Sequence, residues 1–496
     1  MIPKETRLPS VRLRRAWHIT IFLTVAALMM GPAIWNGYPL IYYDTEDYIE
    51  TAFTFEPIIW RIMTYGVLCT VARVFNTPWA MVVLQALLTA YVLHEAVYGF
   101  VGRWRKLVFL VVGTALALFT GLPWVASQVL ADVFAGTMVL GVAALAFGEG
   151  LSIWRRRALG VVTAVGVCVH MSHVAVAAGL WMVLLVVWGL SKLLRRMPRP
   201  RMTVVSAALL GGIALVPATH FAFTGQAYFS RSGQVLQLAL FVQTGVAKQY
   251  LDEVCPKGAS LRMCEHKDNL PYTADEFLWG PSPFDDLGGW VALHDEAGEI
   301  VRGAMLTFPN AVALSAFDNT LEQLDLIATG EDLVPMTWHF VKTQLKYFPK
   351  EFRQFRFAKQ QRRPAIAFDL INAYQIPIAQ AAELVTVAVL LFAWRRRDRS
   401  STGLAIIVLV ALLGNAIVCG ALSNPHDRYQ NRVVWLALFT SVVGAVRLDQ
   451  RFAGVRRAVI KAENDVLVAE ELAKKASLPL AGQLPPDPVR QPVGKD

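Results

Sequence analysis

The stretch that decides the fold is Asn36–Glu50, NGYPLIYYDTEDYIE, which directly follows the first strongly apolar segment of the chain. It contains four carboxylates, Asp44, Glu46, Asp47 and Glu50, among the tyrosines Tyr42, Tyr43 and Tyr48. Acidic side chains beside a membrane helix are unfavourable unless they face water or a functional site. We therefore expect this segment to be a loop on the non-cytoplasmic face of a membrane, and Asp44 to be the leading catalytic candidate.

The composition is typical of a membrane protein. The chain has 496 residues, of which 55% are hydrophobic and 17% charged, and its mean hydropathy is +0.44. The apolar residues form long blocks, which is the pattern of a protein that crosses a membrane several times. The net charge of +10 comes from short Lys and Arg clusters between these blocks, as in cytoplasmic loops, and this distribution argues against a nucleic-acid partner.

The alternation of apolar blocks and basic clusters predicts an all-α polytopic membrane protein with about ten transmembrane helices and both termini in the cytoplasm. The expected spans are residues 17–35, 79–100, 108–121, 132–154, two short helices within 158–190, 203–223, 377–394, 404–422 and 433–446. Residues 57–75, which contain Arg61 and Arg73, are too short to span comfortably and predict a helix at the membrane interface.

The same pattern predicts four parts. Residues 1–223 form an N-terminal transmembrane module, 224–376 a mostly helical extracytoplasmic insert, 377–457 the C-terminal transmembrane helices, and 458–496 a cytoplasmic amphipathic helix with a disordered tail. Within the insert, residues 301–314 and 338–348 are expected to be helical. Cys255 and Cys264 lie close together there and can form a disulfide if the insert is outside the cytoplasm.

This topology brings the polar motifs to one face. The acidic loop, Asp132, the pair His170 and His173, the insert and the loop NPHDRYQNR at 424–432 all fall on the non-cytoplasmic side. The predicted orientation depends only on the Arg and Lys clusters, so the gathering of these motifs is a separate indication of a site.

The first loop resembles a known family. An apolar helix followed by G-x-P-L-x-x-x-D-T-x-x-Y and an interfacial helix is similar to the start of the GT-C superfamily, integral-membrane glycosyltransferases that take sugar from polyprenyl-phosphate donors. The similarity covers residues 17–190 in layout, and the residues that carry it are Gly37, Pro39, Leu40, Asp44, Tyr48 and Asp132.

The resemblance implies roles for two carboxylates. Asp44 would be the general base, and Asp132 would help to hold a metal ion or the acceptor. Many family members have two adjacent acids where this chain has Asp44 and Thr45, so the sequence does not require a divalent cation, and no residue is assigned as a metal ligand.

The loop at residues 424–432 is the second strongest sequence signal of a functional site. A basic cluster on the outer side runs against the positive-inside bias, and an anionic partner explains it. Arg428 and Arg432 are four residues apart and are expected to clamp a phosphate, with His426 and Tyr429 as further substrate contacts. Tyr48 is expected to contact the substrate from the first loop.

Several of these residues also have structural explanations. Asp132 can cap the helix that follows it, and Glu46, Asp47 and Glu50 can be solvated loop acids. The spacing of His170 and His173 suits one helix face, but a zinc site needs further ligands and none is evident nearby, so substrate contact is the expected role. Two segments of the insert carry weaker signals. Residues 226–243 either line the site or lie at the interface, and residues 279–286 combine aromatic and acidic side chains.

Together these features predict a bacterial inner-membrane glycosyltransferase with its active face in the periplasm or outside the cell. Its partners would be a polyprenyl-phosphate sugar, a glycan or lipid acceptor, and membrane lipids. A lipid-linked glycan polymerase or ligase is one alternative, and a transporter or flippase is another. A transporter is disfavoured because, apart from Glu95 and Glu383, ionisable residues lie at the predicted helix ends. An assembly factor that binds through the insert is a third alternative.

Overall fold

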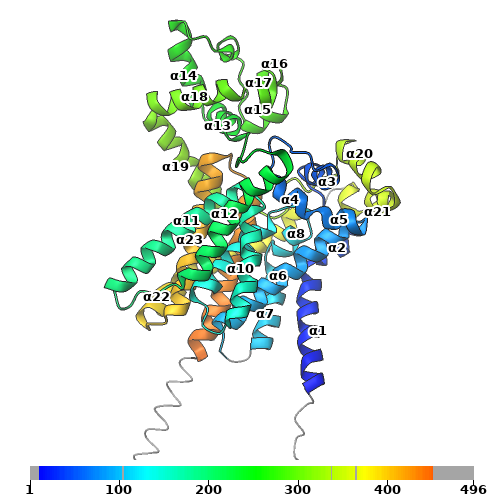
Figure 1. The fold of residues 1–496 in the computed structure, drawn as a ribbon, viewed down its shortest axis with the longest axis vertical. Coiled ribbons are helices and arrows are strands. Elements are labelled where there is room, and N and C mark those ends of the chain that lie inside the picture. Colours follow the sequence, from blue (N-terminus) through cyan, green and yellow to red (C-terminus); the bar gives the residue numbers. More distant parts are fainter. Residues whose placement is uncertain (1–10, 103–104, 337, 364–365, 451–496) are drawn as a thin grey trace, which may run out of the picture. The chain divides into compact units, whose positions relative to one another are not determined.

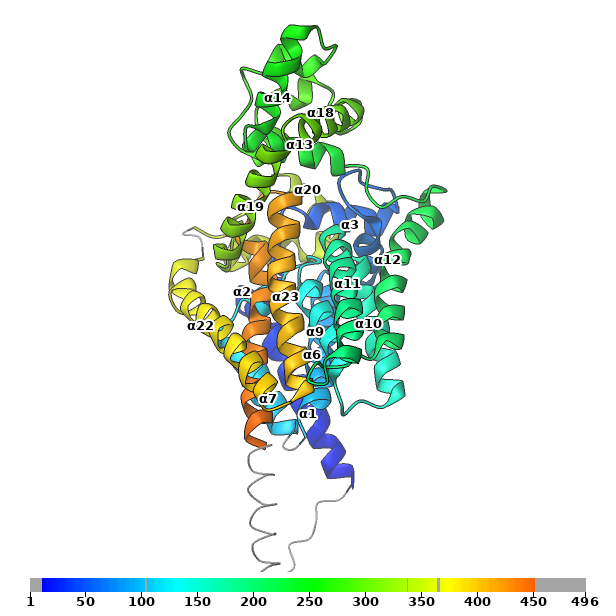
Figure 2. The same ribbon diagram turned by 90° about the vertical axis from the view of Figure 1, so that its left-hand side faces the viewer.

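The computed structural model describes residues 11–102, 105–336, 338–363 and 366–450. Its described part is built from helices, and the described residues up to Arg447 form one compact unit in which α13–α18 stand above the end of a helical bundle (Figures 1 and 2). The predicted helical class is therefore confirmed. The amphipathic helix and tail predicted for residues 458–496 lie outside the described residues.

In chain order the elements are α1 (Val11–Met29), α2 (Gly31–Asn36), α3 (Thr45–Thr54), α4 (Met63–Leu68), α5 (Thr70–Phe75), α6 (Trp79–Phe100), α7 (Arg105–Phe119), α8 (Leu122–Ala126), α9 (Val133–Phe147), α10 (Ile153–Cys168), α11 (Met171–Leu193), α12 (Met202–Thr224), α13 (Gly233–Gln243), α14 (Val246–Val254), η1 (Cys255–Lys257), η2 (Arg262–His266), α15 (Ala274–Trp279), α16 (Pro283–Asp286), α17 (Gly289–Ala292), α18 (His294–Thr307), α19 (Pro309–Asp325), α20 (Trp338–Tyr347), η3 (Pro349–Glu351), α21 (Phe352–Phe357), η4 (Lys359–Gln361), α22 (Phe368–Arg395), α23 (Arg399–Leu422) and a last helix, Asp427–Gln450.

Six helices of the described residues are long and apolar enough to cross a membrane: α6, α11, α12, α22, α23 and the last helix. A seventh candidate, α18 with α19, is bent by 102°. The other four predicted spans coincide with α1, α7, α9 and α10, which do not meet these criteria. With its 15 residues, α9 is about 22 Å long, short of the roughly 30 Å of a bilayer core. Length and composition thus support six of the ten predicted spans.

The helix α9 occupies the centre of the bundle. All of its residues are buried, and it packs against α6, α10 and α23. It is apolar on every side, which is the pattern of a helix enclosed by neighbours. Gly136 allows the buried Trp435 of the last helix to approach its backbone closely.

The sequence predicts a helix break within residues 158–190 and the start of a span at Pro377, and the structure agrees only with the first. The block 158–190 divides as predicted, because α10 ends at Cys168 and α11 begins at Met171, with His170 between them. The expected start of the next span at Pro377 is wrong, because α22 already begins at Phe368 and continues through this proline. A proline removes one backbone hydrogen bond, and the helix persists here on both sides of it.

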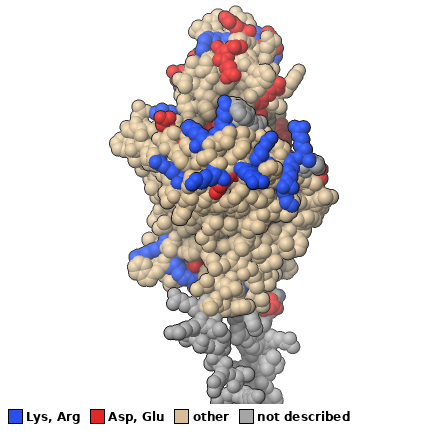
Figure 3. All heavy atoms as spheres, turned by 90° about the vertical axis from the view of Figure 1, so that its right-hand side faces the viewer, with Lys and Arg blue, Asp and Glu red and all other residues tan. Residues whose placement is uncertain are grey.

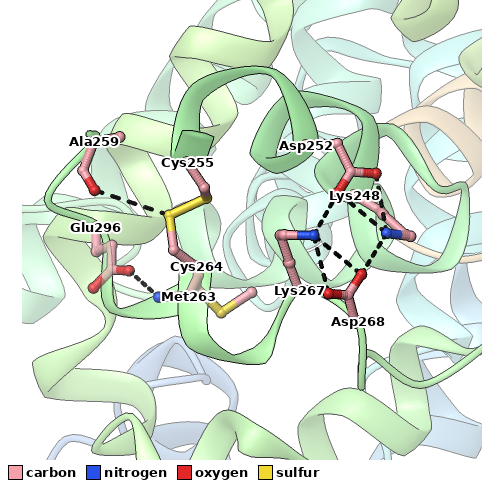
Figure 4. Close-up of a disulfide and its surroundings, with 9 residues drawn as sticks. All are labelled: Lys248, Asp252, Cys255, Ala259, Met263, Cys264, Lys267, Asp268 and Glu296. Carbon is pink, nitrogen blue, oxygen red and sulfur yellow. Dashed lines mark hydrogen bonds and ion pairs between the residues drawn. A yellow bond between two sulfur atoms is a disulfide. The ribbon is translucent and has the colours of Figure 1, made fainter. Parts of the chain in front are cut away.

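The insert has a hydrophobic core of its own, made by residues 235–304 of α13–α18, whereas α19 packs along α23. The predicted disulfide between Cys255 and Cys264 is present (Figure 4). Beside it, Lys248 and Lys267 alternate with Asp252 and Asp268 in an exposed ring of ion pairs. Exposed pairs contribute little to stability, so the disulfide and the apolar core hold this region.

The contact between α9 and the last helix can be tested with two matched glycine substitutions. In Gly136→Ala the new Cβ would lie 2.6 Å from the Trp435 ring, and overpacking of this kind costs about 1–3 kcal/mol. In Gly179→Ala the Cβ meets no atom within 4 Å, and alanine favours the helix. Thermal melting of the purified proteins should show a lower midpoint only for Gly136→Ala. Equal midpoints would contradict this packing.

Candidate functional site

The first loop is fixed against the second. Gly37 adopts φ +84°, a conformation that glycine tolerates, and this turns the chain at the end of α2. The loop then pairs with the segment after α8, because Leu40 donates its N–H to Ser127 and accepts from Val129 N. The two loops that carry Asp44 and Asp132 are thereby joined through their backbones.

Asp44 is buried immediately before α3, with 6% of its surface exposed. Its carboxylate accepts from two guanidinium groups, those of Arg61 and Arg428, the latter at 3.3 Å. Arg428 also lies over the ring of Tyr42, at 4.3 Å from its centroid. The sequence predicts that Asp44 and Arg428 belong to one site, and the structure brings them into direct contact.

Asp132 forms the second half of the same cluster. Its carboxylate accepts from Arg432 Nη1 at 2.7 Å and lies 3.9 Å from Arg428 Nε. It precedes α9, as predicted, but its side chain makes no capping hydrogen bond, so the capping interpretation is not supported. Arg428 is thus the group that connects the two carboxylates.

Arg432 is fully buried, and its hydrogen bonds are made to side chains inside the bundle. Besides Asp132, it donates to Ser172 Oγ at 2.8 Å and to Asn415 Oδ1 at 3.2 Å. The predicted phosphate clamp of Arg428 with Arg432 is therefore not the pair that the structure forms. Arg61 and Arg428 both reach the surface of a pocket, and Arg432 does not.

This pocket has a volume of about 400 Å³ and lies between the first loop, α11, α13 and α23. Its wall is mostly apolar, with a group of polar side chains. The polar residues include Arg61, Arg428, Tyr48, Tyr429, His170 and Ser172, and the apolar residues include Met171, Leu236, Val418 and Leu422. Such a wall suits a ligand with an anionic head and an apolar tail. Asp44 and Asp132 lie behind the arginines, outside the wall.

The histidine pair is divided between two environments. His170 lines the pocket and is 2.8 Å from Ser172 Oγ through Nδ1, whereas His173 is buried against the carbonyl of Gly166. Only His170 is therefore placed as the sequence predicts for substrate contact. Among the described residues, no three His, Cys, Asp or Glu side chains are grouped to hold a metal ion.

His426 holds the insert to the bundle instead of lining the pocket. Its ring contacts Glu331 at 2.7 Å and Asp275 of α15 at 3.3 Å. Burial lowers the pKa of this histidine, but the hydrogen bonds to Asp275 and Glu331 prevail and raise it to about 10. The imidazole is therefore cationic at neutral pH and links α15 to the start of the last helix.

Two residues of the site were not predicted as functional from the sequence. The sequence predicts Arg61 only as part of an interfacial helix, yet an arginine inside PIIWRIM is itself a signal of a site, because ionisable residues in apolar surroundings are usually paired or functional. Ser172 carried no comparable signal. Asp47, read as a solvated acid, is mostly buried and accepts from Trp60 Nε1 at 2.9 Å and Arg61 Nε at 3.2 Å.

No protein-family model matches the chain, and it matches no curated protein and no solved structure. The site must therefore be interpreted from its own geometry.

The pairing of Asp132 with Arg432 can be tested by a double-mutant cycle. Removing one partner of a buried pair leaves an uncompensated charge, which costs about 3–5 kcal/mol. We expect Asp132→Asn and Arg432→Gln each to lower the denaturation midpoint strongly, and the double variant to lose less than the sum of the two. Strictly additive losses would contradict a direct interaction. Lys248→Gln, in the exposed ring of ion pairs, is the control and should melt close to wild type.

The His426 link predicts a defined pH dependence. A histidine whose folded pKa is raised stabilises the fold fully below its unfolded pKa of about 6.5, and this contribution disappears as the pH rises through about 10. The midpoint difference between wild type and His426→Gln should therefore be largest near pH 6 and shrink steadily toward pH 10. A difference that is constant across this range would show that the charge of His426 is not involved.

Proposed function

We propose that this protein is a membrane glycosyltransferase that moves a sugar from a polyprenyl-phosphate donor to an acceptor hydroxyl. The observation that carries the proposal is the pocket in which two guanidinium groups, Arg61 and Arg428, meet an apolar wall beside the carboxylate of Asp44. A polyprenyl-phosphate sugar has the matching parts, an anionic phosphate and a long apolar chain. The resemblance of the first loop to the GT-C superfamily favours the same donor class.

In this proposal the phosphate binds to Arg428 and Arg61, and the lipid follows Met171, Val418 and Leu422 toward the bilayer. Arginine suits this task because its planar group donates two hydrogen bonds to phosphate oxygens. The same contacts stabilise the negative charge that develops when the bond between sugar and phosphate breaks.

Asp44 acts as the general base. It accepts the proton of the acceptor hydroxyl while the hydroxyl oxygen attacks the anomeric carbon, and polyprenyl phosphate leaves on the opposite side with inversion. Before substrate arrives, Asp44 is the counter-ion of both arginines. Phosphate offers these arginines another anion, which weakens their hold on Asp44 and opens its path to the hydroxyl. Because Asp44 and Asp132 each pair with guanidinium groups, no step is assigned to a metal ion.

The proposed location is a bacterial inner membrane, with a role in cell-envelope polysaccharide biosynthesis. The ten helical segments that coincide with the predicted spans would cross or enter the bilayer, with both termini in the cytoplasm. The Arg clusters around residues 155–157 and 395–399 favour a cytoplasmic position for those ends. The Cys255–Cys264 disulfide favours an oxidising compartment for the insert.

The test compares two carboxylates of the first loop. A general base contributes about 10²–10⁴-fold to a rate, so Asp44→Asn should reduce sugar transfer at least 100-fold in a membrane assay. Glu50→Gln, which alters a contact with Lys346 outside the pocket, should leave transfer unchanged. Asp44→Asn should still be stabilised thermally by polyprenyl phosphate, whereas Arg428→Gln should lose this stabilisation. Full transfer by Asp44→Asn would refute the assignment.

A further inference from the structure

A dense band of positive charge lies on α20, α21 and the short helices η3 and η4. Figure 3, which shows the side of the molecule where α20 and α21 lie in Figure 1, displays Lys and Arg gathered across this face. Residues 342–363 contain eight cations and a single acid, Glu351. We call these cations the basic belt: Lys342, Lys346, Lys350, Arg353, Arg356, Lys359, Arg362 and Arg363. All except the half-buried Lys359 are exposed.

The belt lies at the level where bundle helices end. Gln360 donates its backbone N–H to Asn36 Oδ1 at 2.7 Å, which fixes η4 to the end of α2. At the other end of the belt, Arg363 lies five positions before Phe368, the first residue of the candidate span α22. The belt is therefore next to the surface of whatever membrane the bundle crosses, and not on the distant core of the insert.

Aromatic rings alternate with the cations of the belt. Lys359 lies 4.4 Å from the ring centroid of Trp35, Lys346 lies 4.6 Å from that of Tyr347, and Arg353 lies 6.0 Å from that of Phe357. Trp35 and Phe357 are 48% and 62% exposed. Lys and Arg mixed with exposed aromatic rings in one layer are typical of segments that rest among lipid headgroups.

From this arrangement we infer that the basic belt is a binding surface for anionic phospholipid headgroups. Each cation held near a negatively charged membrane surface is attracted to it, and the rings insert at the boundary of headgroups and acyl chains. An acidic glycan would also satisfy the charge. The belt lies at the level of the helix ends and directly before the candidate span α22, so the lipid is the occupant that the observations favour.

The segment that carries the belt also contacts the loop that carries Asp44, through residues that lie between the cations. Gln360 bonds the backbone of Ile41 through both its Oε1 and its Nε2, and Thr343 donates to Glu46 at 3.0 Å. Lipid bound to the belt would therefore hold in place the segment on which the first loop rests. The inference itself concerns lipid binding and does not depend on the proposed transferase activity.

The test measures lipid binding by the full-length protein in a neutral detergent. Phosphatidylglycerol and phosphatidylcholine are titrated separately, and the shift of the thermal midpoint gives an apparent affinity. The belt variant is Arg353→Gln with Arg356→Gln. The control is Lys257→Gln with Arg302→Gln, which removes the same charge from η1 and α18, away from the belt. Phosphatidylglycerol should stabilise wild type and control alike, and the belt variant should bind it roughly fivefold more weakly per charge removed.

Other outcomes would overturn the inference. Equal phosphatidylglycerol affinity in the belt variant and the control would show that the belt does not bind this lipid. Stabilisation by a polysulfated oligosaccharide but not by phosphatidylglycerol would assign the belt to an acidic glycan. If the double variant melts below wild type without lipid, Lys350→Gln alone is compared with Lys257→Gln, and equal affinities there would again overturn the inference.

Discussion

The rest of the site depends on one partly buried guanidinium group. Arg428 contacts Asp44 at 3.3 Å and approaches Asp132 at 3.9 Å, so it joins two carboxylates from two different loops. Around it, Arg61 pairs with Asp44 and Asp47, and Arg432 pairs with Asp132. Three acids and three arginines balance in an interior where an unpaired charge is strongly unfavourable. This requirement fixes the relative positions of the first loop, the start of α9 and the start of the last helix.

The balance of charge extends to the wall of the pocket, where two of the three arginines reach the surface. Arg61 and Arg428 each present part of their guanidinium group to the pocket while the other part holds Asp44. A site of this kind is stable when empty, because every charge has a partner. Under the proposed function, a phosphate that enters would receive further hydrogen bonds from these arginines. Phosphate binding and the release of Asp44 would then be linked through the same two side chains.

The segments outside the bundle support this arrangement. Gln360 takes the place of a strand partner for the first loop by bonding both the N–H and the carbonyl of Ile41. Tyr38, fully buried, packs against Phe355 and donates to Glu351 at 3.2 Å. The loop that carries Asp44 is therefore held from one side by the bundle and from the other by α20–η4, although it has no regular structure between α2 and α3.

The sequence by itself determined the helical class, the apolar segments and the break at His170, and it allowed the disulfide, because these depend on local patterns of hydrophobicity, charge and spacing. It also singled out Asp44, Asp132 and Arg428, since charged residues beside apolar segments are unusual. Only the tertiary structure decided that Arg61, not Arg432, shares the pocket with Arg428, and that His173 and His426 lie away from it. The reason is physical. Which arginine pairs with which carboxylate depends on contacts between segments up to 384 residues apart, and no local pattern encodes them.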